Sequence, residues 1–217
     1  MKPKLTYFNI RGRAEPIRLL LTLSGVEFED CRVPFERWGQ MKSTTPFGSL
    51  PIYEEGDLKI GQSLAILRYL AGQHGWLPDR LPDRVRCDEV AEATVDLSAE
   101  CSRLFWSPHF AEEREPYIRR QLPARLAYLD AHLRKNGRSD CWVGSELYYC
   151  DFLAWAALNR VEPLAATLLE QFAALTEFKR TFEARPEVVS YLDHPHRPKT
   201  FTFSMAQFGG TPATSGR

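Results

Sequence analysis

Residues 5–18 of the chain read LTYFNIRGRAEPIR and change pattern halfway along. The first part, residues 5–10, is rich in apolar, β-branched and aromatic side chains and predicts a strand. Over residues 14–24 apolar side chains recur on neighbouring helical turns, which predicts a helix. Pro16 then falls in the first turn, where a missing N–H costs nothing. A strand followed at once by a helix is typical of an α/β unit.

The next stretch continues the sheet. Residues 26–33 alternate apolar and polar side chains, which predicts a second strand. Residues 50–53 and 58–60 flank the turn sequence EEGD at 54–57, so we predict a hairpin there.

A helix follows the hairpin. Residues 61–63, GQS, open a helical pattern whose apolar side chains form one stripe, and the pattern ends before Gly75. Residues 76–82 contain two prolines, which interrupt helical patterns. We therefore predict an α/β domain over residues 1–75 and a linker over residues 76–82.

Beyond residue 83 no strand pattern survives, and the chain predicts successive amphipathic helices. We expect an all-α domain over residues 83–208. Its helices are predicted at residues 83–106, 114–135, 149–160, 163–172 and 176–184. Residues 209–217 are rich in Gly, Ser and Thr, and we predict a disordered tail.

The charge balance excludes some partners. The 217 residues carry 28 Lys and Arg against 28 Asp and Glu, a formal net charge of zero at pH 7. No overall field therefore favours nucleic acid or an anionic membrane, and neither partner is expected. No segment has the length and apolarity of a signal peptide core or a membrane span. A cytoplasmic location is expected.

The cysteine pattern predicts reduced thiols and no metal site. The chain has an odd number of cysteines, none of them in a Cys-x-x-Cys pair and none with histidines at the spacing of a zinc site. They are Cys31, Cys87, Cys101, Cys141 and Cys150. Reduced thiols agree with a cytoplasmic protein.

Three stretches at these spacings together resemble the glutathione transferases. They are YFNIRGRAEPIR at 7–18, FGSLP at 47–51 and GQSLAILRYL at 61–70. The first resembles the start of sigma-class members, which include prostaglandin D synthases and S-crystallins. The resemblance covers the chain closely to about residue 75, and the remainder by helix count and a few positions. It implies a thioredoxin-like glutathione-binding domain, a helical domain with the electrophile pocket, and a homodimer.

Such an enzyme requires glutathione, its co-substrate, as a thiolate. A free thiol with a pKa of about 8.5 is only a few per cent ionised at neutral pH. Lowering that pKa by about two units takes roughly 2.7 kcal/mol, and one hydrogen bond to a charged group supplies about 1.5 to 3 kcal/mol. The resemblance assigns this bond to Tyr7, whose alternative role is that of a packed strand aromatic. It also implies Arg13 as a positive charge near the sulfur, the alternative being a solvated arginine.

The resemblance further implies ligands for the two ends of glutathione. Gln62 and Ser63 precede a helix whose free N–H groups and positive end suit the γ-glutamyl carboxylate. Ser63 is also a suitable N-cap, and the two roles are compatible. Trp38 and Lys42 match the ligands of the glycyl carboxylate, although a lone tryptophan is more often a packing residue.

Four more residues complete the implied glutathione site. The resemblance implies a cis bond between Leu50 and Pro51, which would turn the Leu50 backbone toward the cysteinyl unit, whereas X-Pro statistics alone favour trans. Ser49 replaces a longer polar residue at this step, so it is at most a short substitute. Asp96 matches an acidic residue that reaches the glutathione of the other subunit, and the alternative is a solvent-facing carboxylate.

The implied electrophile pocket combines aromatic and apolar side chains with one arginine. Its members are Phe8, Arg13, Cys101, Leu104, Phe105, Trp106 and Phe203. Apolar walls suit hydrophobic electrophiles. At helical spacing, however, such residues are also common in ordinary cores.

The function implied is conjugation of glutathione to hydrophobic electrophiles, with peroxide reduction or prostaglandin isomerisation as additional activities. The alternative is a structural, crystallin-like or ligand-carrying protein that does no catalysis. Retention of the residues at 7, 13, 62 and 63 argues against it, because a protein selected for solubility need not keep a glutathione site. A thiol oxidoreductase would require a cysteine where Tyr7 stands.

Overall fold

The computed structural model describes residues 2–210, which form two compact units. The first holds residues 2–75 together with the described part of 190–217, and the second holds residues 76–189. This division differs from the predicted one, because residues 190–208 pack with the first unit instead of the helical domain. Most of the predicted tail, residues 211–217, lies outside the described residues.

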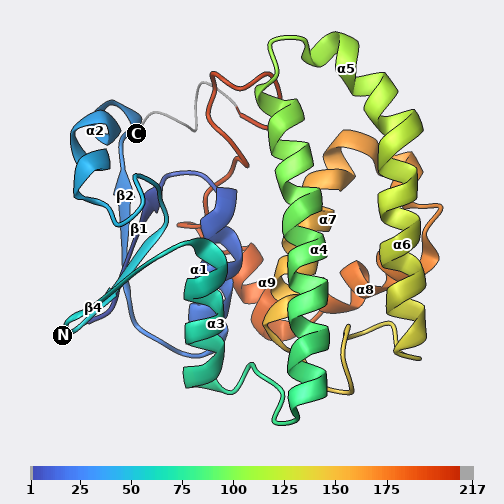
Figure 1. The fold of residues 1–217 in the computed structure, drawn as a ribbon, viewed down its shortest axis with the longest axis horizontal. Helices are drawn as coiled ribbons and strands as arrows, with labels where there is room; N and C mark the ends of the chain where they lie inside the picture. Colours follow the sequence, from blue (N-terminus) through green and yellow to red (C-terminus); the bar gives the residue numbers. More distant parts are fainter. Residues whose placement is uncertain (1, 211–217) are drawn as a thin grey trace. The chain divides into compact units, whose positions relative to one another are not determined.

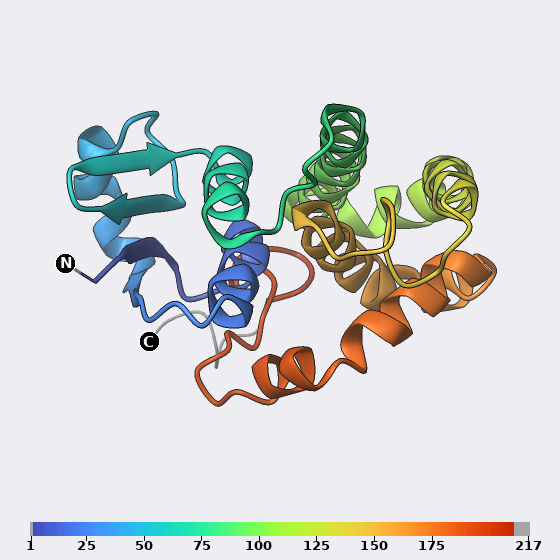
Figure 2. The same ribbon diagram turned by 90° about the horizontal axis from the view of Figure 1, so that it is seen from below.

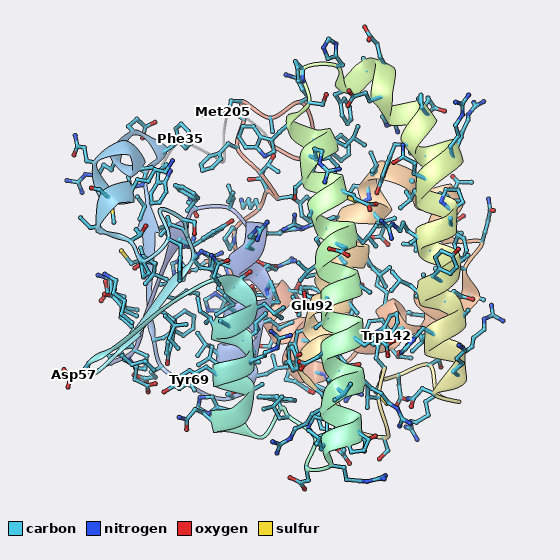
Figure 3. The ribbon with its side chains drawn as sticks, viewed as in Figure 1. Phe35, Asp57, Tyr69, Glu92, Trp142 and Met205 are labelled. Atoms are coloured by element: carbon cyan, nitrogen blue, oxygen red, sulfur yellow. The ribbon has the colours of Figure 1, made fainter. Side chains whose placement is uncertain are left out.

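A mixed four-stranded sheet forms the centre of the first unit (Figure 1). Its strands are β1 (Lys4–Phe8), β2 (Glu29–Val33), β3 (Ile52–Glu55) and β4 (Leu58–Gly61), in the order β2-β1-β3-β4. β1 pairs with β2 in parallel, with Tyr7 opposite Arg32, and the other pairs are antiparallel. Asp57 marks the tip of the β3–β4 hairpin (Figure 3).

Helices cover both faces of this sheet. α1 (Glu15–Leu23) and α3 (Ser63–His74) lie on one face, and α2 (Phe35–Met41) lies on the opposite side (Figure 2). α1 and α3 bury their apolar stripes because a helix on a sheet must shield one side from water. The predicted α/β architecture is therefore confirmed.

The sequence did not predict α2 or the short 3-10 turn at Lys42–Thr44 that follows it. None of the residues of α2 is buried. Periodicity detects helices by their apolar stripe, so a short exposed helix gives no such signal.

The second unit consists of helices, and its described residues contain no strand. The elements are α4 (Leu81–Trp106), α5 (Phe110–Pro116), a π-helical turn (Tyr117–Gln121), α6 (Leu122–Lys135), α7 (Tyr149–Leu169) and α8 (Ala173–Glu183). α9 (Pro186–Leu192) carries the chain back to the first unit. Within residues 2–210 no helix is both long and apolar enough to cross a membrane.

Two of the predicted helix boundaries fall at prolines. Helix α7 is kinked just after Pro163: its backbone departs from helical geometry at Ala165 (φ −154°, ψ 53°), so two helical segments meet there, close to where the sequence predicted one helix to end and another to begin. α9 was missed because Pro186 was interpreted as a breaker, whereas proline at a first helical position is favourable.

Aromatic side chains and one carboxylate organise the core of the second unit. Trp142, labelled in Figure 3, packs edge-on against Phe178 with ring centroids 5.7 Å apart. Asp151, fully buried in the first turn of α7, accepts the backbone N–H groups of Trp142 at 2.9 Å and of Tyr148 at 2.8 Å. The carboxylate thereby fixes the start of α7.

Candidate functional site

Tyr7 is a buried residue with its hydroxyl held in place. It lies on β1 with 6% of its surface exposed. Its hydroxyl oxygen accepts the backbone N–H of Arg13 at 3.0 Å. The guanidinium of Arg18 lies 5.8 Å from the centre of its ring. Because a phenol can accept and donate at once, the Tyr7 O–H can still donate to another group.

Gly12 allows the turn to pass close to this hydroxyl. Its φ is +45°, a region that side chains disfavour. A Cβ atom at this position would stand 2.7 Å from Cε1 of Tyr7 and closer still to the hydroxyl oxygen. Only glycine therefore fits between β1 and α1 without moving Tyr7. The sequence interpretation did not identify this role.

Gln62 and Ser63 start α3 in an unusual way. Gln62 has φ +70° and ψ +114°, and it is the only residue other than glycine with positive φ among residues 2–210. Backbone strain of this kind costs about 1 to 3 kcal/mol and is concentrated at functional sites. Gln62 is the N-cap and makes no side-chain capping bond, so the interpretation of Ser63 as the cap is wrong. The first N–H groups of α3 are left for another acceptor.

The segment before β3 contains the expected cis bond. The Leu50–Pro51 peptide is cis, as the resemblance implied. Leu50 and Pro51 are buried and Ser49 is half-buried. Lys42 is exposed, and its side chain passes next to Gly48.

An aromatic cluster adjoins Tyr7 in the first unit. The Phe8 ring lies 5.0 Å from Phe203 and 5.7 Å edge-on from Trp38, and Phe203 lies 5.0 Å from Phe35. Two predicted pocket residues, Phe8 and Phe203, are thus brought together, and Trp38 packs against Phe8. Phe35 was missed because it lies on the unpredicted helix α2. Phe35 and the exposed Met205 lie on the same side of this unit (Figure 3).

Four other predicted pocket residues belong to the end of α4 in the second unit, whereas Arg13 is exposed on the turn before α1 in the first. Cys101, Leu104 and Phe105 are buried, whereas Trp106 is exposed. Burial raises the pKa of the Cys101 thiol to about 11, so it stays protonated at neutral pH. Asp96 is exposed on the same helix.

The cysteines are free thiols. Within residues 2–210 no three His, Cys, Asp or Glu side chains come together in a way that could hold a metal ion.

Known sequence families match both units. Residues 3–72 match the glutathione S-transferase N-terminal domain, and residues 95–195 match the glutathione S-transferase C-terminal domain. The chain belongs to the glutathione S-transferase family. It is therefore a transferase that uses glutathione as co-substrate, with a thioredoxin-like domain followed by a helical domain.

Individual relatives agree with this assignment. The transferase is 35% identical over 195 residues to glutathione S-transferase P of Caenorhabditis elegans, which covers 89% of this chain and 93% of the relative. The solved pi-class glutathione S-transferase of Onchocerca volvulus is 31% identical, with a TM-score of 0.89 over 95% of this chain and 100% of its own. A sigma-class enzyme of Fasciola hepatica is 29% identical, with a TM-score of 0.84 over 92% and 98%. Pi, mu and sigma relatives all match, so the comparisons establish the family and not the class.

Proposed function

We propose that this glutathione transferase activates its co-substrate with the hydroxyl of Tyr7. One contact carries the proposal. The Arg13 N–H donates to the Tyr7 oxygen at 3.0 Å, which orients the hydroxyl and leaves its proton for a thiolate. A charge-assisted bond of this kind supplies about 1.5 to 3 kcal/mol, enough to lower the thiol pKa by one to two units. The guanidinium of Arg13 adds a positive charge on the same turn.

Glutathione then lies along the first unit, from α3 to α2. The free N–H groups at the start of α3, with Gln62 and Ser63, bind the γ-glutamyl carboxylate. The Leu50 backbone pairs with the cysteinyl unit beside Pro51, and Ser49 makes a short contact at most. Trp38 and Lys42 bind the glycyl carboxylate.

Ser63→Ala is expected to weaken glutathione binding several-fold, because it removes one hydroxyl from a charged ligand. Turnover of bound glutathione should change less, since this end of the ligand lies away from the sulfur. Calorimetric titration measures the affinity. Ser24→Ala is a matched control in the same unit, where the hydroxyl donates to the Leu20 carbonyl of α1 (2.8 Å). Equal affinity of wild type and Ser63→Ala would refute the role of Ser63.

The second substrate is a hydrophobic electrophile. The aromatic rings of Phe8, Phe35 and Phe203 beside Tyr7 support this class, because apolar walls bind apolar ligands. The residues at the end of α4, Cys101, Leu104, Phe105 and Trp106, are proposed as further walls. Detoxification is the proposed role, and peroxide reduction and prostaglandin isomerisation are proposed as additional activities.

Two measurements test the catalytic assignment against the crystallin-like alternative. The protein should be retained on immobilised glutathione and should conjugate glutathione to a generic aryl halide. Retention without conjugation would favour a ligand-carrying protein, and failure of both would favour a structural protein. The sigma class is proposed on the sequence of residues 7–18, and a cytoplasmic location on the free cysteines.

The proposed active unit is a homodimer. α4 exposes large apolar side chains one turn apart, with Leu81 71% and Val85 57% exposed, and side chains of this kind are typical of interfaces. A two-fold interface would bring Asp96 of each chain to the partner's glutathione. Asp96→Ala is then expected to raise the glutathione requirement several-fold without abolishing turnover, since an exposed ionic contact contributes little.

A heterodimer of one Tyr7→Phe chain and one Asp96→Ala chain tests this assignment. If Asp96 acts across the interface, both defects fall in one site, and the other site works normally at low glutathione. If Asp96 acts within its own chain, neither site combines normal affinity with normal chemistry. Steady-state kinetics at low glutathione distinguish the patterns, and the second pattern would contradict the proposal.

A further inference from the structure

Residues 198–210, here named the C-terminal loop, close on themselves through hydrogen bonds. The backbone N–H groups of Phe201 and Thr202 both donate to the Gly209 carbonyl, at 3.0 and 3.3 Å. The Thr202 hydroxyl, on a residue only 4% exposed, donates to the Phe208 carbonyl at 3.0 Å. Because its two ends are joined in this way, the loop presents its outer carbonyls in a defined arrangement.

These carbonyls hold the turn that follows β1. The Arg11 N–H donates to the Thr200 carbonyl at 2.8 Å, and the Gly12 N–H donates to the Phe201 carbonyl at 3.1 Å. The Arg11 side chain adds a bond to the Pro198 carbonyl at 2.9 Å and lies 4.7 Å from the centre of the Phe201 ring.

The next N–H along the chain is that of Arg13, which donates to the Tyr7 hydroxyl. Three consecutive backbone N–H groups therefore join the C-terminal loop to the Tyr7 oxygen. The strength of a hydrogen bond depends steeply on its angle, so the direction of the Tyr7 O–H depends on where this turn is held. Gly12 has no side chain that could anchor the turn, and the hydrogen bonds from the loop are among its supports.

We propose that the C-terminal loop positions the Tyr7 hydroxyl toward the glutathione sulfur, with Thr202 and Arg11 as positioning residues. This inference rests on the proposed role of Tyr7 in thiol activation. It assigns an effect on thiol activation to a segment almost two hundred positions away from Tyr7 in the sequence.

Two substitutions test the proposal in the full-length protein. Thr202→Val removes the bond to the Phe208 carbonyl and keeps the shape of the side chain, and Arg11→Gln removes the contacts with Pro198 and Phe201. Each variant is saturated with glutathione without an electrophile, and the thiolate is followed by its ultraviolet absorbance as the pH is raised. The thiol pKa should rise by about half a unit, which lowers the thiolate fraction and kcat at pH 6.5 about two- to threefold. The affinity for glutathione should stay within about twofold.

Matched controls lie in the second unit. Thr176→Val removes a hydroxyl bond to the Phe172 carbonyl (2.8 Å), and Arg114→Gln removes a guanidinium bond to the Leu164 carbonyl (3.2 Å). Both controls should titrate bound glutathione like the wild type. Thermal melts identify any variant that does not fold. If one of the two loop variants fails to fold, the thiol pKa of the other tests the proposal.

The same titration in a Tyr7→Phe background separates the two proposals. In that background, Thr202→Val and Arg11→Gln should cause no further rise in the thiol pKa, because their effect passes through the Tyr7 hydroxyl, which is already absent. If Tyr7→Phe raises the thiol pKa but neither loop substitution does, the positioning role is refuted and that of Tyr7 stands. If the loop substitutions shift the pKa equally in both backgrounds, the route through Tyr7 is refuted. An unchanged pKa in Tyr7→Phe alone would refute the role of Tyr7 itself.

Discussion

Tyr7→Phe is expected to retain glutathione binding but to lower the conjugation rate at pH 6.5 by about one to two orders of magnitude. The substitution removes the donor to the sulfur, so the pKa of the bound thiol rises toward its free value of about 8.5. As the pH approaches that value the thiol ionises without help, and the defect should shrink. Initial rates with an aryl halide from pH 6 to 9 measure both effects. Tyr128→Phe, on the exposed surface of α6, is the matched control.

A wild-type rate at pH 6.5 would contradict the role of Tyr7. A defect that stays constant across the pH range would also contradict it, because the rate would then be limited by something other than thiol ionisation.

Gly12→Ala is expected to lower kcat at pH 6.5 by about tenfold or more. The new methyl group would collide with the Tyr7 ring and hydroxyl, so the hydroxyl must move or the turn must shift. A side chain at φ +45° also costs about 1 to 2 kcal/mol of folding stability. Steady-state kinetics and thermal unfolding measure the two effects separately.

Gly25→Ala separates backbone strain from contact with Tyr7. Gly25 has φ +66° in the same unit, and a Cβ atom there meets nothing within 4 Å. This control should lose similar stability and keep its kcat. Equal kcat for Gly12→Ala and wild type would show that the close approach to Tyr7 does not matter for catalysis.

Much of the architecture could be predicted because burial leaves a local period. Apolar residues recur within a few positions in the strand with Tyr7 and in the helix after it. Two short apolar stretches flank the turn at 54–57 and mark the hairpin. α2 and α9 escaped prediction because one buries nothing and the other begins with Pro186. The candidate site was predicted from the family resemblance, which names Tyr7, Gln62 and Ser63 but not the contacts among them.

The sequence by itself determined the two classes of domain, the identity of the tyrosine on β1 and the glycine after it, since these depend on neighbouring residues. Only the tertiary structure decided how Gly12 and the C-terminal loop hold that tyrosine. The Arg11–Thr200 and Gly12–Phe201 hydrogen bonds join positions far apart in the chain. They involve backbone groups that every residue except proline carries, so no side-chain pattern could reveal them.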